Sequence, residues 1–165
     1  MTTEALSSLS RPVSVSDIPP EGVDVAVEAR PEEREALARE FKLPAIHALT
    51  GAFRLSGTRS RVHVSGRVDA RIEQICVVTL DPFESEVHEE VEVDFAGSRA
   101  TPSQGEDPPD EIVGGAVDLG VLTAEFLSLG LDPHPRKPGV DFSFEAADDP
   151  PPSPFAALEK LKRGE

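Results

Sequence analysis

The fold is decided by the stretch Arg61-Val-His-Val-Ser-Gly-Arg-Val-Asp-Ala-Arg-Ile-Glu-Gln-Ile-Cys-Val-Val78, which carries the longest alternation of apolar and polar side chains in the chain. Period-two alternation is typical of a β-strand with one buried face. Gly66 interrupts the apolar row, which indicates a bulge or close packing. Ile75 and Val77 interrupt the polar row, so we expect both faces of this strand to be covered at its end. The apolar row is Val62, Val64, Val68, Ala70, Ile72, Cys76 and Val78.

A second alternation follows and predicts a hairpin partner for this strand. Its apolar row is Phe83, Val87, Val91, Val93 and Phe95, and its polar row is Glu84, Glu86, His88, Glu90, Glu92 and Asp94. A two-residue turn at Leu80-Asp81 sets Arg71 opposite Glu90 and Arg67 opposite Asp94. Any turn of even length keeps both apolar rows on the core side. The face on which each side chain lies therefore does not depend on the exact turn length, whereas the cross-strand charge pairs do.

Two helices and one further strand are predicted outside the hairpin. Residues 22–29 alternate as a strand. The segment 31–41 begins with proline and two glutamates, which suit the first turn of a helix. Asp118 is the expected N-cap of a second, deeply packed helix that ends at Gly130. Its apolar stripe holds Leu119, Leu122, Phe126 and Leu129, widened by Val121, Ala124 and Leu127.

The fold class predicted from these elements is α+β, a curved and mainly antiparallel β-sheet with two or three packed helices and a short C-terminal tail helix. We expect a single domain over residues 1–145, with a mobile acidic loop at 98–111 that lacks apolar periodicity. A Pro-rich linker at 146–153 is expected to precede an amphipathic tail at 154–165.

Charge limits the classes of partner. Against 16 basic residues the 165-residue chain has 31 acidic ones, a formal net charge of −15. This charge repels nucleic-acid phosphates and attracts basic proteins, but it also serves solubility alone, and both interpretations stay open. The single Cys76 fits a reducing compartment. With no secretory apolar run in residues 1–10 and no membrane span, we expect a cytoplasmic protein without membrane contact.

No catalytic or metal site is predicted, and no cofactor. A structural zinc site needs about four Cys or His ligands, whereas the chain has one Cys and four scattered His. We expect Cys76 to act as a small buried apolar residue. His63 and His88 fall on polar strand faces, where acidic neighbours are within reach, and no nucleophile or phosphate-loop motif accompanies them.

Two groups of residues are candidate interaction sites. The first is a row of arginines, whose five positive charges less the carboxylate of Asp69 give a local charge of +4. Internal ion pairing, protein contact and RNA contact are the three alternatives for this row, which comprises Arg54, Arg59, Arg61, Arg67 and Arg71. The second group lies in the tail and comprises Phe155, Leu158, Lys160, Leu161 and Lys162. A short helix needs a docking surface to be stable, either on this domain or on a partner, and of these two we expect a groove on a partner.

Three segments together resemble one known family, and their order and spacing cover nearly the whole chain from Arg11 to Lys162. They are Gln74-Ile-Cys-Val-Val-Thr-Leu-Asp-Pro-Phe83, Val117-Asp-Leu-Gly-Val-Leu-Thr-Ala-Glu-Phe-Leu127 and Pro154-Phe-Ala-Ala-Leu-Glu-Lys-Leu-Lys162. The pattern resembles the YceD family of large ribosomal RNA subunit accumulation proteins in its alphaproteobacterial form. The matching positions are Cys76, Leu80, Pro82, Phe83, Asp118, Leu119, Gly120, Leu127, Pro154, Phe155 and Leu158. Many relatives carry a second Cys where this chain has Thr79, which argues against a metal-dependent role.

The resemblance implies a non-enzymatic factor that supports large-subunit ribosomal RNA accumulation and ribosome assembly. The partners it implies are ribosomal proteins or large-subunit precursors, with direct RNA contact left open and no DNA contact. The alternative is an acidic protein-interaction module unrelated to ribosomes.

Overall fold

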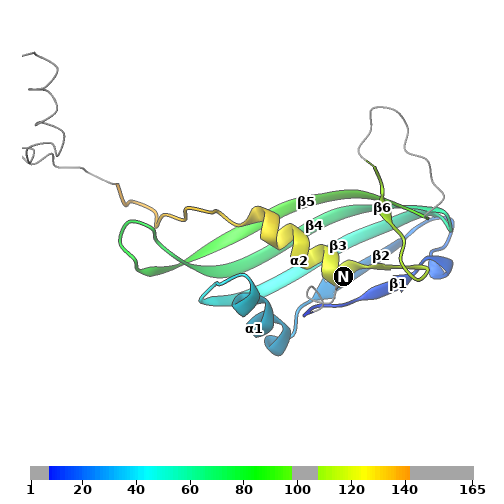
Figure 1. Ribbon diagram of the computed structural model, residues 1–165. Coiled ribbons are helices and arrows are strands. Elements are labelled where there is room, and N and C mark those ends of the chain that lie inside the picture. The colour runs from blue at the N-terminus through cyan, green and yellow to red at the C-terminus, as the bar shows by residue number, and fades with distance from the viewer. Residues whose placement is uncertain (1–7, 98–107, 142–165) are drawn as a thin grey trace, which may run out of the picture.

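A five-stranded sheet in the order β2-β3-β4-β5-β6 forms the main layer of the structure (Figure 1). The computed structural model describes residues 8–97 and 108–141. Neighbouring strands are antiparallel, except that β6 runs parallel to β5. The strand bounds are β2 (Val23–Glu28), β3 (Ala45–Thr58), β4 (Arg61–Ile75), β5 (Pro82–Ala96) and β6 (Asp110–Glu111).

One face of the main sheet is covered by helix α2 (Leu119–Gly130), and helix α1 (Pro31–Glu40) packs against β3 (Figure 1). A second, two-stranded sheet pairs β1 (Pro12–Ser14) with β7 (Ala116–Asp118), and a short 3-10 turn at Val15–Asp17 follows β1. This arrangement is the predicted α+β class with a mainly antiparallel sheet. The predicted tail helix lies outside the described residues.

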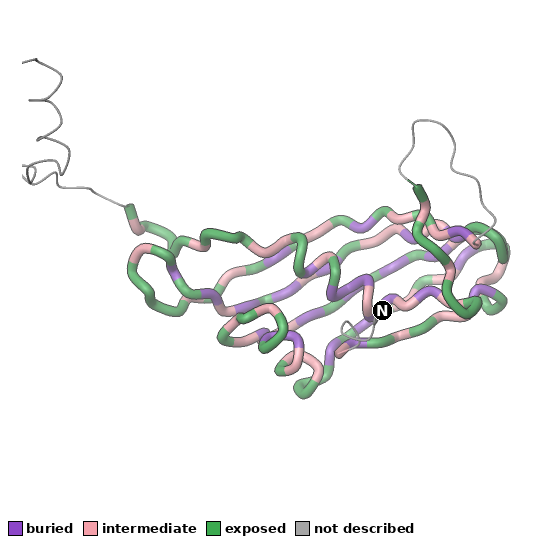
Figure 2. Tube along the Cα trace, viewed as in Figure 1, coloured by how far each residue is buried: buried purple, intermediate pink, exposed green. Residues whose placement is uncertain are grey.

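The predicted facing of the hairpin is confirmed. Val62, Val64, Val68 and Ile72 are completely buried, and Val87 and Val91 of β5 join them in the core. Figure 2 shows buried and exposed residues alternating along these strands. The alternation therefore sorts the side chains between core and solvent, as the period of two requires.

The predicted hairpin register is wrong, because the connection between β4 and β5 is longer than two residues. Residues 76–81 link the strands, and the ladder starts at Ile75 opposite Pro82. Arg71 is therefore opposite Glu86, and Arg67 is opposite Glu90. The shift is even, so every side chain keeps its predicted face. The residue opposite each arginine, however, lies four positions earlier in β5 than predicted.

Strand β3 was not predicted, and it is an inner strand of the sheet, between β2 and β4. A bulge between Ile46 and Ala48 reverses the parity of its buried positions, from Ile46 to Leu49. Gly66 of β4 lies against this strand. A Cβ atom at Gly66 would stand 2.0 Å from the carbonyl oxygen of Ala52, so the interruption of the apolar row reflects close packing of two backbones.

The strand predicted at 22–29 and the helix predicted at 31–41 are confirmed as β2 and α1. Asp118 caps α2 as predicted, because its Oδ1 accepts hydrogen bonds from the backbone N–H groups of Gly120 and Val121 at 2.9 and 3.2 Å. Leu129 is an exception within this helix. It was assigned to the apolar stripe, yet it is 74% exposed.

Two further predictions need correction. Coverage of both faces at the end of β4 was wrong, since Ile75 and Val77 are 42% and 45% exposed. The loop predicted at 98–111 does not extend to its expected end, because Asp110 and Glu111 form β6 beside Phe95 and Ala96. The positions 98–107 lie outside the described residues.

The N-terminal segment is tied to both helices by polar contacts. The guanidinium of Arg11 donates two hydrogen bonds to the carboxylate of Glu33 on α1, at 2.9 and 2.8 Å. These bonds are the main reason why the pKa of Glu33 is lowered. The backbone N–H of Arg11 also donates to Asp118 at 2.7 Å. Asp118 thus holds the start of α2 and the start of the described chain together.

Candidate interaction surface

The solvent face of the sheet carries four arginines of the predicted row, with Arg59 in the turn between β3 and β4, but it is not a uniformly basic patch. All five arginines are exposed. Arg54 of β3 pairs with Asp24 at 3.0 Å, and Arg67 of β4 pairs with Asp69 at 3.2 Å. Within the described chain, no ion pair reaches Arg59, Arg61 or Arg71.

The acidic row of β5 runs next to these arginines on the same face. Glu86 and Glu90 are the cross-strand neighbours of Arg71 and Arg67. Charges of both signs therefore alternate across this face, which weakens its attraction for a nucleic-acid backbone. Internal ion pairing is present at Arg54 and Arg67. For the row as a whole, internal pairing, protein contact and RNA contact all stay predictions.

Histidines on this face lie beside carboxylates, as predicted for His63 and His88. The Nδ1 atom of His63 is 2.9 Å from Asp94, and that of His88 is 2.8 Å from Asp69. The hydrogen bond to Asp69 raises the pKa of His88 above its usual value. Among the described residues, no group of three or more His, Cys, Asp or Glu side chains is placed to hold a metal ion.

The turn after β4 is built around Cys76, which is completely buried. Its backbone N–H donates to the carbonyl of Asp81, and its carbonyl accepts from the N–H of Leu80, both at 2.9 Å. These two bonds close the turn, and Leu80 takes a φ of 60° within it. Such a backbone conformation costs a residue with a Cβ atom about 1–2 kcal/mol. The prediction that Cys76 is buried with the apolar row of β4 is confirmed.

Hydrogen bonds also lower the pKa of the Cys76 thiol to about 6. The largest cause is the backbone N–H of Lys137, which donates to the sulfur at 3.4 Å, followed by the hydroxyl and backbone of Thr79. Burial opposes this shift and is outweighed. Thr79 thus supplies hydrogen-bond donors to the Cys76 thiol.

The segment 132–137 is held along this turn. Val77 donates its backbone N–H to the carbonyl of Pro135 at 2.9 Å. The buried Gln74 accepts a hydrogen bond from Ser85 at 2.9 Å and donates one to the carbonyl of Asp132 at 3.4 Å. These contacts fix the chain leaving α2 against the hairpin end.

Most family-motif positions have a role in packing or in turns. Leu119 and Leu127 are completely buried in the core. Gly120 lets α2 pack directly on the N-terminal segment, because a Cβ atom there would stand 2.7 Å from the carbonyl oxygen of Leu9. Pro82 begins β5, where Phe83 is half-buried. Leu80 and Pro82 are exposed instead, and Leu80 is 74% exposed.

The predicted tail site cannot be placed, because its residues lie outside the described part of the chain. This applies to Phe155, Leu158, Lys160, Leu161 and Lys162, and to the motif position Pro154.

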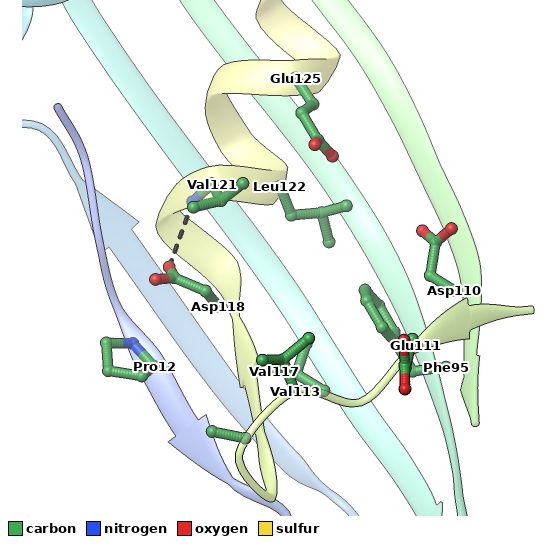
Figure 3. Close-up of a pocket in the computed structure, with 11 residues that line it drawn as sticks. Pro12, Phe95, Asp110, Glu111, Val113, Val117, Asp118, Val121, Leu122 and Glu125 are labelled. Carbon is green, nitrogen blue, oxygen red and sulfur yellow. Dashed lines mark hydrogen bonds between the residues drawn. The ribbon is translucent and has the colours of Figure 1, made fainter. Parts of the chain in front are cut away.

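A groove that the sequence did not predict lies between α2 and the end of the main sheet (Figure 3). Its volume is about 500 Å³. Phe95 of β5 and Leu122 of α2 are apolar residues of its lining, and Val113 stands at the groove 74% exposed. In Figure 3 the carboxylates of Glu125 on α2 and Asp110 on β6 reach the groove from opposite sides. The two groups interact, since the charge of Asp110 contributes to the raised pKa of Glu125.

Sequence reasoning missed this groove because its walls come from distant parts of the chain. Glu125 was treated only as part of a packed apolar helix, and Asp110 and Glu111 as part of a loop. One signal was present in the sequence. Glu125 is the sole charged side chain of α2, in the helix Leu119–Gly130.

The described residues contain no helix that is long and apolar enough to cross a membrane. A comparison with protein families finds that the model described as "Large ribosomal RNA subunit accumulation protein YceD" matches residues 64–162. This range includes β4 from Val64 onward, the hairpin turn, β5 and α2. No curated protein and no solved structure matches the chain.

Proposed function

The chain belongs to the YceD family, named for large ribosomal RNA subunit accumulation, and we propose that it supports this accumulation by assisting assembly of the large subunit. The family match over residues 64–162 is the observation that carries this proposal. The order and spacing of the three motif segments also support the alphaproteobacterial form of the family. We place its action in the cytoplasm, where bacterial subunits assemble.

In this proposal the protein acts by binding and not by catalysis. The family name states no catalytic role. The described surface offers exposed charges, and the one thiol whose pKa is lowered is buried. An assembly factor of this kind raises ribosomal RNA levels because RNA bound in a correctly assembled particle is protected from degradation.

Protein components of the particle are favoured over RNA as the direct contact. The net charge of −15 opposes approach to phosphates, whereas it steers basic proteins toward the surface. On the sheet face, the acidic row of β5 runs beside the arginines of β4 and reduces their field. Direct RNA contact through Arg59, Arg61 and Arg71 is the second proposal for this face.

We also propose that the C-terminal tail contributes to partner binding. Residues 154–162 combine an apolar row with basic side chains in an otherwise acidic protein. Deletion of residues 153–165 should leave the thermal unfolding temperature nearly unchanged and reduce association with large-subunit precursors. A large loss of thermal stability would show instead that the tail belongs to the fold.

The decisive experiment is affinity purification of the full chain followed by sucrose-gradient sedimentation. Co-migration with large-subunit precursors supports the assembly role. Single substitutions then divide the tail contribution, since Leu158→Ser tests the apolar row and Lys160→Gln tests the charge. Glu159→Gln is the matched control and should not weaken the association. A set of partners without ribosomal components would favour an acidic interaction module unrelated to ribosomes.

A further inference from the structure

The groove beside α2 has a chemical character that identifies a class of ligand. Its eleven lining residues include four carboxylates and no lysine, arginine or histidine. Apolar side chains, among them Phe95, Val113 and Leu122, complete the lining. The site therefore combines an apolar surface with negative charge, and no cationic side chain in the lining neutralises it.

The four carboxylates are not equivalent. Asp118 is engaged, because it accepts hydrogen bonds from the N-terminus of α2 and from Arg11. For Asp110, Glu111 and Glu125 the described residues provide neither a hydrogen-bond donor nor an ion pair. These three groups are available to a ligand, and they come from two elements on opposite sides of the groove (Figure 3).

The environment of Glu125 indicates that a ligand of this groove carries positive charge. The pKa of Glu125 is raised, first because its partial burial disfavours the carboxylate and second because Asp110 repels it. A cation placed between the two carboxylates would offset both effects, whereas an anion would increase them. RNA phosphate is therefore the wrong ligand for this surface.

We propose that this groove binds an extended segment of a partner protein in which a lysine or arginine stands next to an apolar side chain. The cation would lie between Glu125 and Asp110, and the apolar neighbour would pack on Phe95 and Leu122. Basic segments of this kind are what proteins use to neutralise RNA phosphates, so components of a ribosomal particle carry them in abundance. This inference rests on the proposed function and names the class of partner for it.

Peptide binding to the full-length protein tests the proposal. The probe is a fluorescein-labelled peptide of about ten residues in which arginine, leucine and serine repeat, and its control carries glutamate in place of arginine. Fluorescence anisotropy measures the dissociation constant at low and high salt. We expect the arginine peptide alone to bind, and its affinity to fall as salt is raised.

Two variants with the same change in net charge separate the groove from the general acidity of the protein. The groove variant replaces Asp110 by Asn and both Glu111 and Glu125 by Gln. The control variant replaces Glu28, Glu90 and Glu92 by Gln, all of which are exposed and absent from the groove lining.

The groove variant should lose about tenfold or more in affinity, because each of three charge contacts changes binding by a few-fold, and the control variant about twofold or less. Val113→Lys provides an independent check. It puts a cation at the groove mouth and should weaken the arginine peptide without removing any carboxylate. Circular dichroism confirms that each variant is folded.

Equal losses in the groove and control variants would overturn the proposal, because they would show attraction to net charge alone. Equal binding of the glutamate peptide would overturn it as well. A gain in affinity after deletion of residues 153–165 would assign the groove to this chain's own basic tail and not to a partner. The proposed function fails separately, if the wild-type protein never co-sediments with large-subunit precursors while it still binds the arginine peptide through the groove.

Discussion

Gly120 provides the sharpest test of how α2 is anchored, because substitution by alanine should destabilise a helix that alanine normally favours. Alanine is about 1 kcal/mol better than glycine inside a helix. In this structure, however, a Cβ atom at Gly120 would stand 2.7 Å from the carbonyl oxygen of Leu9 and 2.8 Å from the amide nitrogen of Arg11. Both contacts are with backbone, which cannot rotate away, so the N-terminal segment must move.

The cost of that movement can be worked from the contacts that hold the segment. Leu9 is completely buried, and exposing its side chain costs about 1.5–3 kcal/mol. The hydrogen bonds from Arg11 to Asp118 and from Leu119 to Arg11 contribute about 1 kcal/mol each. After the gain in helix propensity, we expect Gly120→Ala to lower the free energy of unfolding by about 2.5–4 kcal/mol.

Urea denaturation followed by circular dichroism is the appropriate assay, because the chain has no Trp or Tyr to report on unfolding by fluorescence. Gly97→Ala is the matched control. A Cβ atom added at Gly97 would have no atom within 4 Å, so the effect of this substitution should stay within about 0.5 kcal/mol. The reasoning is refuted if Gly120→Ala is as stable as the wild type or more stable.

Two further predictions concern the hairpin and its turn. Arg71→Glu should lower the free energy of unfolding by at most about 1 kcal/mol, and Val91→Asp should lower it several-fold more, because Arg71 is exposed whereas Val91 is buried. A denaturant titration measures both, and equal losses would contradict the assignment of these side chains to opposite faces of the sheet. The ultraviolet absorbance of the Cys76 thiolate should appear with a midpoint near pH 6, and Thr79→Val should raise that midpoint by removing a hydrogen-bond donor. Folding lowers the pKa of the Cys76 thiol from 9.0 to about 6, because the folded protein donates hydrogen bonds to the thiolate. The stabilisation of the fold by this thiolate is therefore fully present above pH 9 and is lost as the pH falls toward 6. As the pH rises from 6 to 9, the free energy of unfolding of the wild type should therefore increase relative to that of Cys76→Ser. A difference between the two proteins that does not change with pH would refute the hydrogen-bonded thiolate.

The sequence predicted which residues of the hairpin face the core, but not which residues pair. Facing depends on parity, and a connection longer by an even number of residues leaves parity unchanged. Pairing depends on the turn, which here uses a left-handed Leu80 and a closing bond between Cys76 and Asp81. Neither feature has a local sequence signal, since glycine is the residue that ordinarily marks a positive φ.

Strand β3 escaped prediction for a related reason. Its buried positions change parity at the bulge between Ile46 and Ala48, so no single alternation runs through the strand. Gly51 is buried in the strand without an apolar side chain, which weakens the hydrophobic pattern further. The strand exists because β2 and β4 both pair with it, and such tertiary pairing overrides a weak local pattern.

The positions that carry the family resemblance and the positions that can bind a partner are largely different residues. Leu119, Gly120 and Leu127 are buried at the contact between α2 and the rest of the fold. Motif residues of this type identify the architecture, because their substitution would displace the helix. In our proposal, partner choice depends on exposed groups that this architecture brings together, such as Asp110 and Glu125 across the groove. Loss of association in groove variants that stay folded would consequently report on recognition, whereas loss after Gly120→Ala would report first on stability.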